Sequence, residues 1–267
     1  MPLSRSEVQG RAQDDPHLLA DPTYARLVMR RVSPPVTYAI VRWTSLSADA
    51  ITGLAILCGL AAALVILVAT APAFLLAALL LQLSYLFDTV DGEVARVRGT
   101  AGKRGTYLDL IGHILQNRGL YAASSVVLLR LVDHAWWALA IAFAGLALAS
   151  SFGEQARAQV VGSTAGLAAA HGAASAGARP PIRRPGALLY WSYRRVAFVW
   201  AYPASMNLFC LALLADAARL WYDPSSEPLV LPAFTAVFLA TLALKQLTNA
   251  VRLLDRSLWL PGGGGAR

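Results

Sequence analysis

Long apolar stretches alternate with short polar segments along most of this chain of 267 residues. A helix needs roughly 20 predominantly apolar residues to cross the hydrocarbon core of a bilayer. Six stretches reach or approach that length, and Pro72 separates the first from the second because proline interrupts a helix. The pattern therefore predicts an all-α, polytopic membrane protein with six transmembrane helices. We place these helices at residues 51–71, 73–98, 106–132, 136–156, 196–215 and 229–251.

The overall composition agrees with a membrane protein and argues against an ordinary soluble domain. Hydrophobic residues make up 57% of the chain and charged residues only 14%, whereas a soluble domain carries about a quarter charged residues. Cys58 and Cys210 both lie in apolar runs, so we expect neither a disulfide framework nor a cysteine metal site. The first 45 or so residues are polar and rich in arginine, and we expect no secretory signal peptide there.

Basic residues concentrate in alternate loops, which predicts how the chain is oriented. The formal net charge is +8, and membrane proteins retain Lys and Arg on their cytoplasmic side. The segment between the second and third spans holds Arg96, Arg98, Lys103 and Arg104, whereas the loop after the third span is nearly free of basic residues. We therefore expect a multi-pass protein of the cell inner (cytoplasmic) membrane, with both termini cytoplasmic. Its basic side chains are expected to meet anionic lipid and no nucleic acid.

Three regions follow from this pattern. Residues 1–45 are expected to form a cytoplasmic N-terminal arm, residues 46–256 the helical bundle, and residues 257–267 a flexible C-terminal tail. Within the arm, apolar residues recur at helical spacing among arginines over residues 20–43, which predicts an interfacial amphipathic helix. A loosely ordered basic arm is the alternative interpretation of the same segment.

Four ionisable side chains interrupt the second and third predicted spans. Asp88 and Asp91 are three residues apart and share one helix face, and Asp109 and His113 are four apart on the next helix. A glycine-containing turn at residues 99–105 makes the two helices neighbours, so the four side chains can converge at their cytoplasmic ends. Ionisable groups within a span are costly and usually mark function. Oxygen-rich clusters suit Mg²⁺ or Mn²⁺, which often bridge substrate phosphates. The alternative is that these charges only reach out to interfacial water.

The spacing of these residues resembles a known signature, that of the CDP-alcohol phosphotransferases (CDP-alcohol phosphatidyltransferases). Here the run reads Asp88-x2-Asp91-Gly92-x2-Ala95-Arg96-x8-Gly105-x3-Asp109-x3-His113. The family pattern is D-x2-D-G-x2-A-R-x8-G-x3-D-x3-D, and only the last position differs. Residues 46–52 (LSADAIT) are also similar to the T-P-N-x-x-T entry to the family's first span, with Asp49 in place of asparagine. The likeness extends over about residues 20–255.

The resemblance implies a role for each matching position. Asp88, Asp91 and Asp109 resemble the metal-binding aspartates, and position 113 corresponds to a metal ligand and general base. The implied cofactor is Mg²⁺ or Mn²⁺. On the nucleotide side, the family has small residues that let the CDP group approach the backbone, and they correspond to Gly92, Ala95 and Gly105. The arginine beside the diphosphate corresponds to Arg96. Asp49 and Thr52 are expected at the nucleotide end.

His113 is the one departure from the signature, and it leaves three interpretations open. A neutral imidazole, with an ordinary pKa of about 6.5, can take a proton from a hydroxyl at neutral pH, so His113 could replace the aspartate as base. It could instead be a metal ligand only. The third possibility is a catalytically weakened member of the family.

The resemblance further implies an enzyme that transfers a phosphoalcohol group (phosphatidyl or similar) from a CDP-linked donor to an alcohol acceptor and releases CMP. The donor would be CDP-diacylglycerol or a CDP-alcohol, and the acceptor an alcohol or a sugar or polyol phosphate, in phospholipid or related phosphodiester synthesis. A homodimer is expected by resemblance alone. The rival is a membrane transporter of metal or solute that uses the same acidic cluster. Transporters usually place such sites near the bilayer midplane, whereas this cluster lies at helix ends beside a basic loop.

Overall fold

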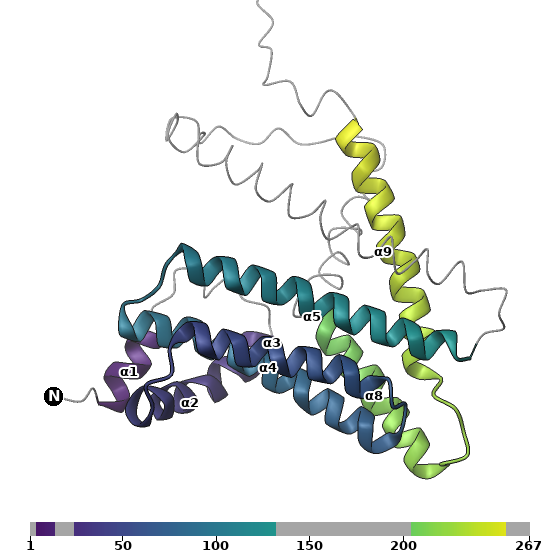
Figure 1. Cartoon of the computed structure of the whole chain (residues 1–267), viewed down its shortest axis with the longest axis horizontal. Helices are drawn as coiled ribbons and strands as arrows, with labels where there is room; N and C mark the ends of the chain where they lie inside the picture. The colour runs from purple at the N-terminus through teal and green to yellow at the C-terminus, as the bar shows by residue number, and fades with distance from the viewer. Residues whose placement is uncertain (1–3, 14–23, 132–203, 255–267) are drawn as a thin grey trace, which may run out of the picture.

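The computed structural model describes residues 4–13, 24–131 and 204–254, and all regular structure within these ranges is helical (Figure 1). The prediction of an all-α protein is therefore confirmed for the described part. The predicted fourth span, the start of the fifth and the C-terminal tail lie outside the described residues. The elements are α1 (Arg5–Ala12), η2 (Ala25–Met29), α2 (Arg30–Trp43), α3 (Ala48–Ile66), α4 (Ala71–Arg98), α5 (Lys103–Leu129), α8 (Ala204–Tyr222) and α9 (Val230–Leu254).

The long helices form a bundle around α3 and α4. Helix α3 packs against both α4 and α5, α8 packs against α4, and α9 contacts α5 and α8. The short helices α1 and α2 both pack on α4, at the end of the bundle where α4 turns into α5 (Figure 1). The site-bearing helices α4 and α5 are thus held by neighbours on several sides.

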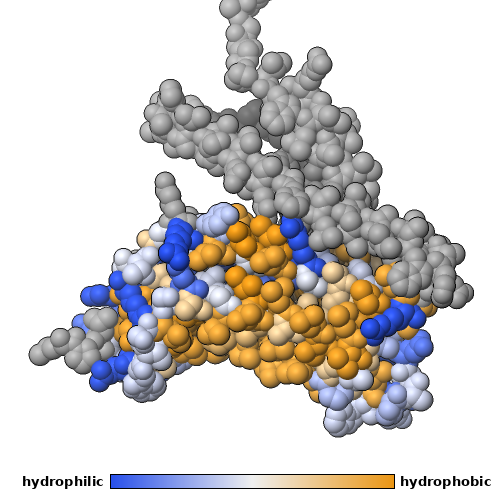
Figure 2. All heavy atoms as spheres, in the orientation of Figure 1, coloured by the Kyte–Doolittle hydropathy of each residue, from blue (hydrophilic) through white to orange (hydrophobic). Residues whose placement is uncertain are grey.

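Three of the helices, α3, α4 and α8, are long and apolar enough to cross a membrane. Figure 2 shows a broad hydrophobic band across the middle of the bundle, with hydrophilic side chains toward its ends. Large apolar side chains of these helices are exposed, among them Leu57, Leu64 and Leu211. An exposed apolar surface of this extent is expected where lipid surrounds the protein. The protein is therefore membrane-integral, while the full count of six spans stays a prediction.

The turn between α3 and α4 differs from the predicted one. We expected the first span to continue to residue 71 and to stop at Pro72, but α3 ends at Ile66 and α4 already begins at Ala71. Ala69 adopts a positive φ of 55° in this turn, and Pro72 lies in the first turn of α4. Proline is well tolerated there because the first backbone N–H groups of a helix have no helical partner.

Helix α4 ends at Arg98, and Gly99 follows it and turns the chain toward α5. Its φ of 69° is left-handed, a conformation that glycine adopts at little cost. The following amide of Thr100 donates to the Ala95 carbonyl at 2.8 Å and satisfies one of the last carbonyls of α4. A glycine turn is thus present and places the start of α5 beside the end of α4, but it is shorter than the predicted turn at residues 99–105, because α5 already begins at Lys103 and includes Gly105.

Glycines allow α3 and α5 to approach closely. A Cβ atom added to Gly59 would lie 2.6 Å from Cγ of Gln116, and one added to Gly112 would lie 2.9 Å from Cγ1 of Ile56. Small residues are a common means of close helix packing within membranes. This contact sets the position of α5, which carries Asp109 and His113.

A fully buried carboxylate attaches α2 to α4. Glu93 of α4 accepts hydrogen bonds from Ser33 Oγ and Thr37 Oγ1 of α2, each at 2.6 Å, and lies 3.5 Å from Arg30 Nη1. A buried charge needs such partners, because an unpaired one is strongly destabilising. Helix α2 occupies much of the segment predicted to be amphipathic, and its location at the membrane interface stays a prediction.

Candidate metal site

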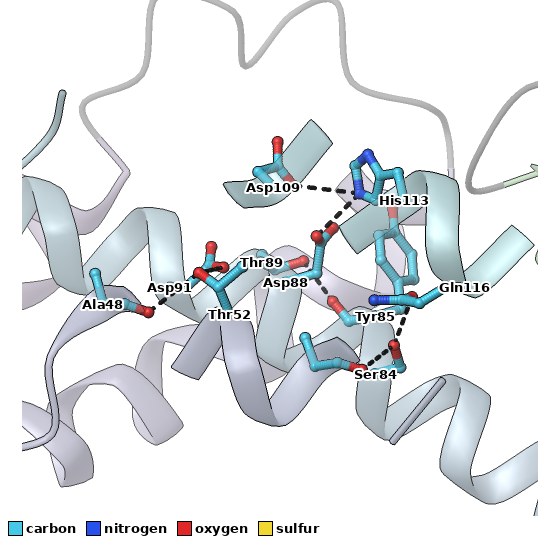
Figure 3. A network of polar contacts seen from close by, with 11 residues as sticks. Ala48, Thr52, Ser84, Tyr85, Asp88, Thr89, Asp91, Asp109, His113 and Gln116 are labelled. Carbon is cyan, nitrogen blue, oxygen red and sulfur yellow. Dashed lines mark hydrogen bonds and ion pairs between the residues drawn. The ribbon is translucent and has the colours of Figure 1, made fainter. Parts of the chain in front are cut away.

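Two carboxylates and one imidazole meet between α4 and α5. Nε2 of His113 lies 3.0 Å from Oδ1 of Asp88 and 3.3 Å from Oδ1 of Asp109 (Figure 3). One ligand atom from each of the three residues lies within 4.8 Å of the others. We call Asp88, Asp109 and His113 the acidic trio. Its members come from two helices that the sequence predicted to be neighbours.

The local structure explains why these side chains converge. Asp109 and His113 are separated by four residues on α5, so they project from the same helix face. Asp88 lies on α4 about three turns before the Gly99 turn, at a height that matches the first turns of α5. Convergence of the trio therefore depends on helical spacing within α5 and on the antiparallel return at Gly99.

The trio is partly open to its surroundings. The side chain of Asp88 is 14% exposed and that of His113 is 27% exposed, whereas the side chain of Asp109 is 44% exposed. Access to the site therefore lies on the Asp109 side. Two partly buried carboxylates repel each other, and a cation between or beside them lowers that repulsion.

The contacts of His113 favour a proton on one of its two ring nitrogens. Ionised carboxylates only accept hydrogen bonds, so the short contacts to Asp88 and Asp109 are favourable when Nε2 carries a proton. In the neutral tautomer with that proton, Nδ1 is the remaining acceptor of the ring. Asp88 and Asp109 can thus orient the imidazole in the way that a carboxylate orients a catalytic histidine.

Asp91 is buried next to the trio but makes a different contact. Its side chain accepts a hydrogen bond of 2.5 Å from Thr52 Oγ1 of α3, and the residue is only 8% exposed. The same hydroxyl lies 3.2 Å from the Ala48 carbonyl (Figure 3). The structure therefore brings three of the four predicted ligands together and holds Asp91 beside Thr52, a residue that we had assigned to the nucleotide end.

The positions predicted to meet the nucleotide lie around the end of α4. Arg96 Nε donates to the Ala12 carbonyl of α1 at 3.0 Å. Gly92 lies one turn before Arg96, and a Cβ atom there would be 3.3 Å from the guanidinium. Open space surrounds Gly105, where an added Cβ would meet nothing within 4 Å, and Ala95 is half-buried.

Asp49, the other position predicted at the nucleotide end, forms an ion pair. Its Oδ2 atom lies 3.1 Å from Nε of Arg104, across the gap between the start of α3 and the start of α5. The arginine side chain is 84% exposed, so water screens this pair and its contribution to stability is small. Its position at the bundle end, near the Gly99 turn, is compatible with contact to a polar ligand.

Sequence reasoning missed two polar contacts that support the site. Glu93 was left unassigned, although Ser33 and Thr37 at a spacing of four formed a hydroxyl pair that could have suggested a buried acidic partner. Below the trio, Ser84 Oγ lies 2.8 Å from Gln116 Oε1 and donates toward the Ala55 carbonyl at 2.8 Å. This second contact joins α3, α4 and α5 directly under His113 (Figure 3).

Comparison with known proteins gives a match to a protein family. A family model described as CDP-alcohol phosphatidyltransferase matches residues 45–178. The matched range includes α3, α4 and α5, and with them the acidic trio, Asp91 and Thr52. No curated protein matches the chain.

Proposed function

The chain belongs to the CDP-alcohol phosphatidyltransferase family, and on that premise we propose that it transfers a phosphoalcohol group from a CDP-linked donor to an alcohol and releases CMP. The observation that carries the proposal is the acidic trio, in which Asp88, Asp109 and His113 place ligand atoms within 4.8 Å of one another. These are signature positions of the family, and their convergence on one site is what metal-assisted transfer requires.

The carboxylates of the trio fit a divalent cation, because carboxylate oxygens are ligands that both Mg²⁺ and Mn²⁺ accept. We propose that Asp88 and Asp109 hold the ion, and that Asp91 adds a ligand when its carboxylate turns from Thr52. His113 acts as the base beside the ion, because a neutral imidazole has one lone pair and cannot both ligate a metal and accept a proton. A bound cation would neutralise charge on the donor diphosphate and on the departing phosphate.

In the proposed reaction His113 receives the proton of the acceptor hydroxyl. Asp88 and Asp109 orient the ring through Nε2, which leaves Nδ1 as the accepting atom. The acceptor oxygen then forms a bond to the β-phosphorus of the donor, and the bond from that phosphorus to the bridging oxygen breaks. The bridging oxygen leaves with CMP. Asp109 contributes by stabilising the positive charge that develops on the imidazole.

The nucleotide side of the site is proposed around the end of α4. The fixed positive charge of Arg96 suits a diphosphate, and Gly92, Ala95 and Gly105 leave room for the CDP group to approach the backbone. Thr52 and Asp49 lie on α3 at the same end of the bundle. Thr52 also positions Asp91 through its hydrogen bond of 2.5 Å.

The location of the protein in the cell is proposed from the distribution of its basic residues and from the length of its apolar helices. Residues 46–256 would form the catalytic bundle in the inner membrane, with residues 1–45 and 257–267 and the site on the cytoplasmic side. CDP-diacylglycerol or a CDP-alcohol would be the donor, and an alcohol or a sugar or polyol phosphate the acceptor, in phospholipid or related phosphodiester synthesis. We also propose a homodimer, on the basis of the likeness to the family alone.

A screen of substrates tests this function directly. Purified protein is incubated with CDP-diacylglycerol or CDP-alcohols, a set of alcohol acceptors and Mg²⁺ or Mn²⁺, and products are identified by mass spectrometry. We expect CMP and a new phosphodiester to form together in at least one pair. A protein that yields neither, while it moves Mn²⁺ across a vesicle membrane, would be a transporter. A protein that yields neither and moves no metal would be a catalytically weakened member of the family.

A further inference from the structure

A basic cavity lies between α1 and α2, separate from the acidic trio. Its volume is about 380 Å³. Three guanidinium groups and two side-chain amides surround it, and no acidic side chain is among its lining residues. The lining consists of Arg5, Gln9, Gln13, Arg30, Arg31, Pro34 and Pro35.

A proline in α2 explains how the walls of this cavity are joined. Pro34 has no backbone N–H, so the Arg30 carbonyl loses the donor that a helix normally supplies four residues later. The side-chain amide of Gln13 donates to this carbonyl at 3.2 Å and holds the end of α1 against α2. At its other end, α1 is closed by a capping box between Ser4 and Glu7. Helices α1 and α2 therefore form the two walls of the cavity.

The charge inside the cavity is only partly balanced. Arg30 lies 3.5 Å from the buried carboxylate of Glu93, which directs this guanidinium toward α4. Arg5 and Arg31 are exposed, and neither has an ion-pair partner among the described residues. In the part of the chain that the structure describes, two guanidinium groups therefore line the cavity without a neutralising acid. Such a site attracts anions.

The donors of the cavity match a phosphate group. Guanidinium groups bind phosphate oxygens through paired hydrogen bonds, and glutamine amides add neutral donors. The volume falls within the range of small-ligand sites. Helix α1 also receives the Arg96 contact at its Ala12 carbonyl, so the cavity lies at the same end of the bundle as the turn from α4 to α5 (Figure 1).

We propose that this cavity is a second binding site, specific for a phosphomonoester group. The group could belong to a lipid headgroup or to a soluble phosphorylated molecule, because both present the same dianion to Arg5 and Arg31. The cavity is distinct from the acidic trio, since the two share no lining residue.

Two probes distinguish the sources. Full-length protein in nanodiscs of phosphatidylcholine is titrated with radiolabelled glycerol 3-phosphate in the presence of EDTA, which prevents metal-mediated binding at the trio. In parallel, protein in nanodiscs that contain phosphatidic acid is analysed by native mass spectrometry for retained phosphatidic acid. Saturable binding in the first arm supports a soluble ligand, and retention in the second arm alone supports a lipid.

The variant R5Q/R31Q removes both free guanidinium groups, and R11Q/R42Q is its matched control. The control loses the same charge from the same two helices, at exposed positions that do not line the cavity. We expect R5Q/R31Q to weaken binding by about tenfold or more, because charge-assisted hydrogen bonds are lost, and the control to bind as the wild type does. Thermal unfolding checks that both variants fold, and Arg31→Gln alone replaces the double variant if it does not. Absence of binding to both probes, or equal weakening in both double variants, would overturn the proposal.

Discussion

The side chain at position 113 determines which proton transfer is available to the acidic trio. The sequence resemblance predicts aspartate there, whereas this chain has a histidine that contacts Asp88 and Asp109 at 3.0 and 3.3 Å. An imidazole held by two carboxylates is oriented as a base. We therefore expect the histidine to change the proton chemistry of the site and to leave it one carboxylate fewer for a metal ion.

Replacement of His113 tests its role as base. We expect His113→Ala to lower kcat by about 100- to 10,000-fold, the usual contribution of a general base. His113→Asp restores a base whose ordinary pKa, about 4, is lower than that of imidazole, about 6.5. Because a base must be deprotonated to act, the acidic limb of the pH profile of kcat/KM should move to lower pH in His113→Asp. An unchanged profile, or full activity in His113→Ala, would show that His113 is not the base.

Thr52 is expected to control Asp91 through a single hydrogen bond. Thr52→Val keeps the shape of the side chain but removes the hydroxyl that donates to the buried carboxylate of Asp91. Loss of this hydrogen bond should lower the free energy of unfolding by about 1–3 kcal/mol. Thr52→Ser retains the hydroxyl and is the matched control. Thermal unfolding in detergent should show a lower Tm for Thr52→Val than for Thr52→Ser. Equal Tm values for the two variants would mean that the hydrogen bond contributes nothing measurable.

At the scale of helices, the site depends on how closely α5 approaches α3. A Cβ atom at Gly112 would lie 2.9 Å from Ile56, so Gly112→Ala forces the two helices apart or distorts their side chains. Overpacking of this kind costs about 1–3 kcal/mol. We expect Gly112→Ala to lower both Tm and activity, because α5 carries Asp109 and His113.

Gly53→Ala provides the comparison for this helix contact. Gly53 lies on α3, and an added Cβ there would meet nothing within 4 Å. Alanine is also the better helix former, so Gly53→Ala should leave Tm unchanged or raise it. If both alanine variants behave alike in thermal unfolding, close packing of α3 and α5 is not what positions the trio.

The packing of the helices shows which contacts can be predicted from the sequence. Helical spacing was enough to pair Asp109 with His113, and the glycine turn placed Asp88 beside them. The bond between Thr52 and Asp91 depends on the register of α3 against α4, which no spacing within one helix specifies. The end of α3 at Ile66 was also missed, because the apolar run continues through Ala69 and its left-handed backbone leaves no mark in the residue types. The contacts of the fully buried Glu93 were missed for the same reason as the bond between Thr52 and Asp91, since its partners lie on another helix.

For the whole molecule, hydropathy predicted the class of protein well. The apolar stretches correspond to membrane-length helices in α3, α4 and α8, and the bundle presents a hydrophobic band between polar ends (Figure 2). Helix α5 is not among the helices that meet this criterion, which fits the charges that interrupt it. Two of these residues, Asp109 and His113, form the candidate metal site together with Asp88 of α4.

The dependence of CMP formation on Mn²⁺ concentration, compared between wild type and Asp88→Asn, tests this chemistry most directly. Asp88→Asn removes one carboxylate from the trio, and Asp223→Asn serves as control because Asp223 is exposed in the turn after α8 and lies outside the trio. The wild type and the control should form CMP in a Mn²⁺-saturable manner, and Asp88→Asn should be slower by about 100-fold or more, since a catalytic metal contributes several kcal/mol. Formation of CMP without any divalent metal, or equal rates in wild type and Asp88→Asn, would contradict a metal-assisted transfer at Asp88, Asp109 and His113.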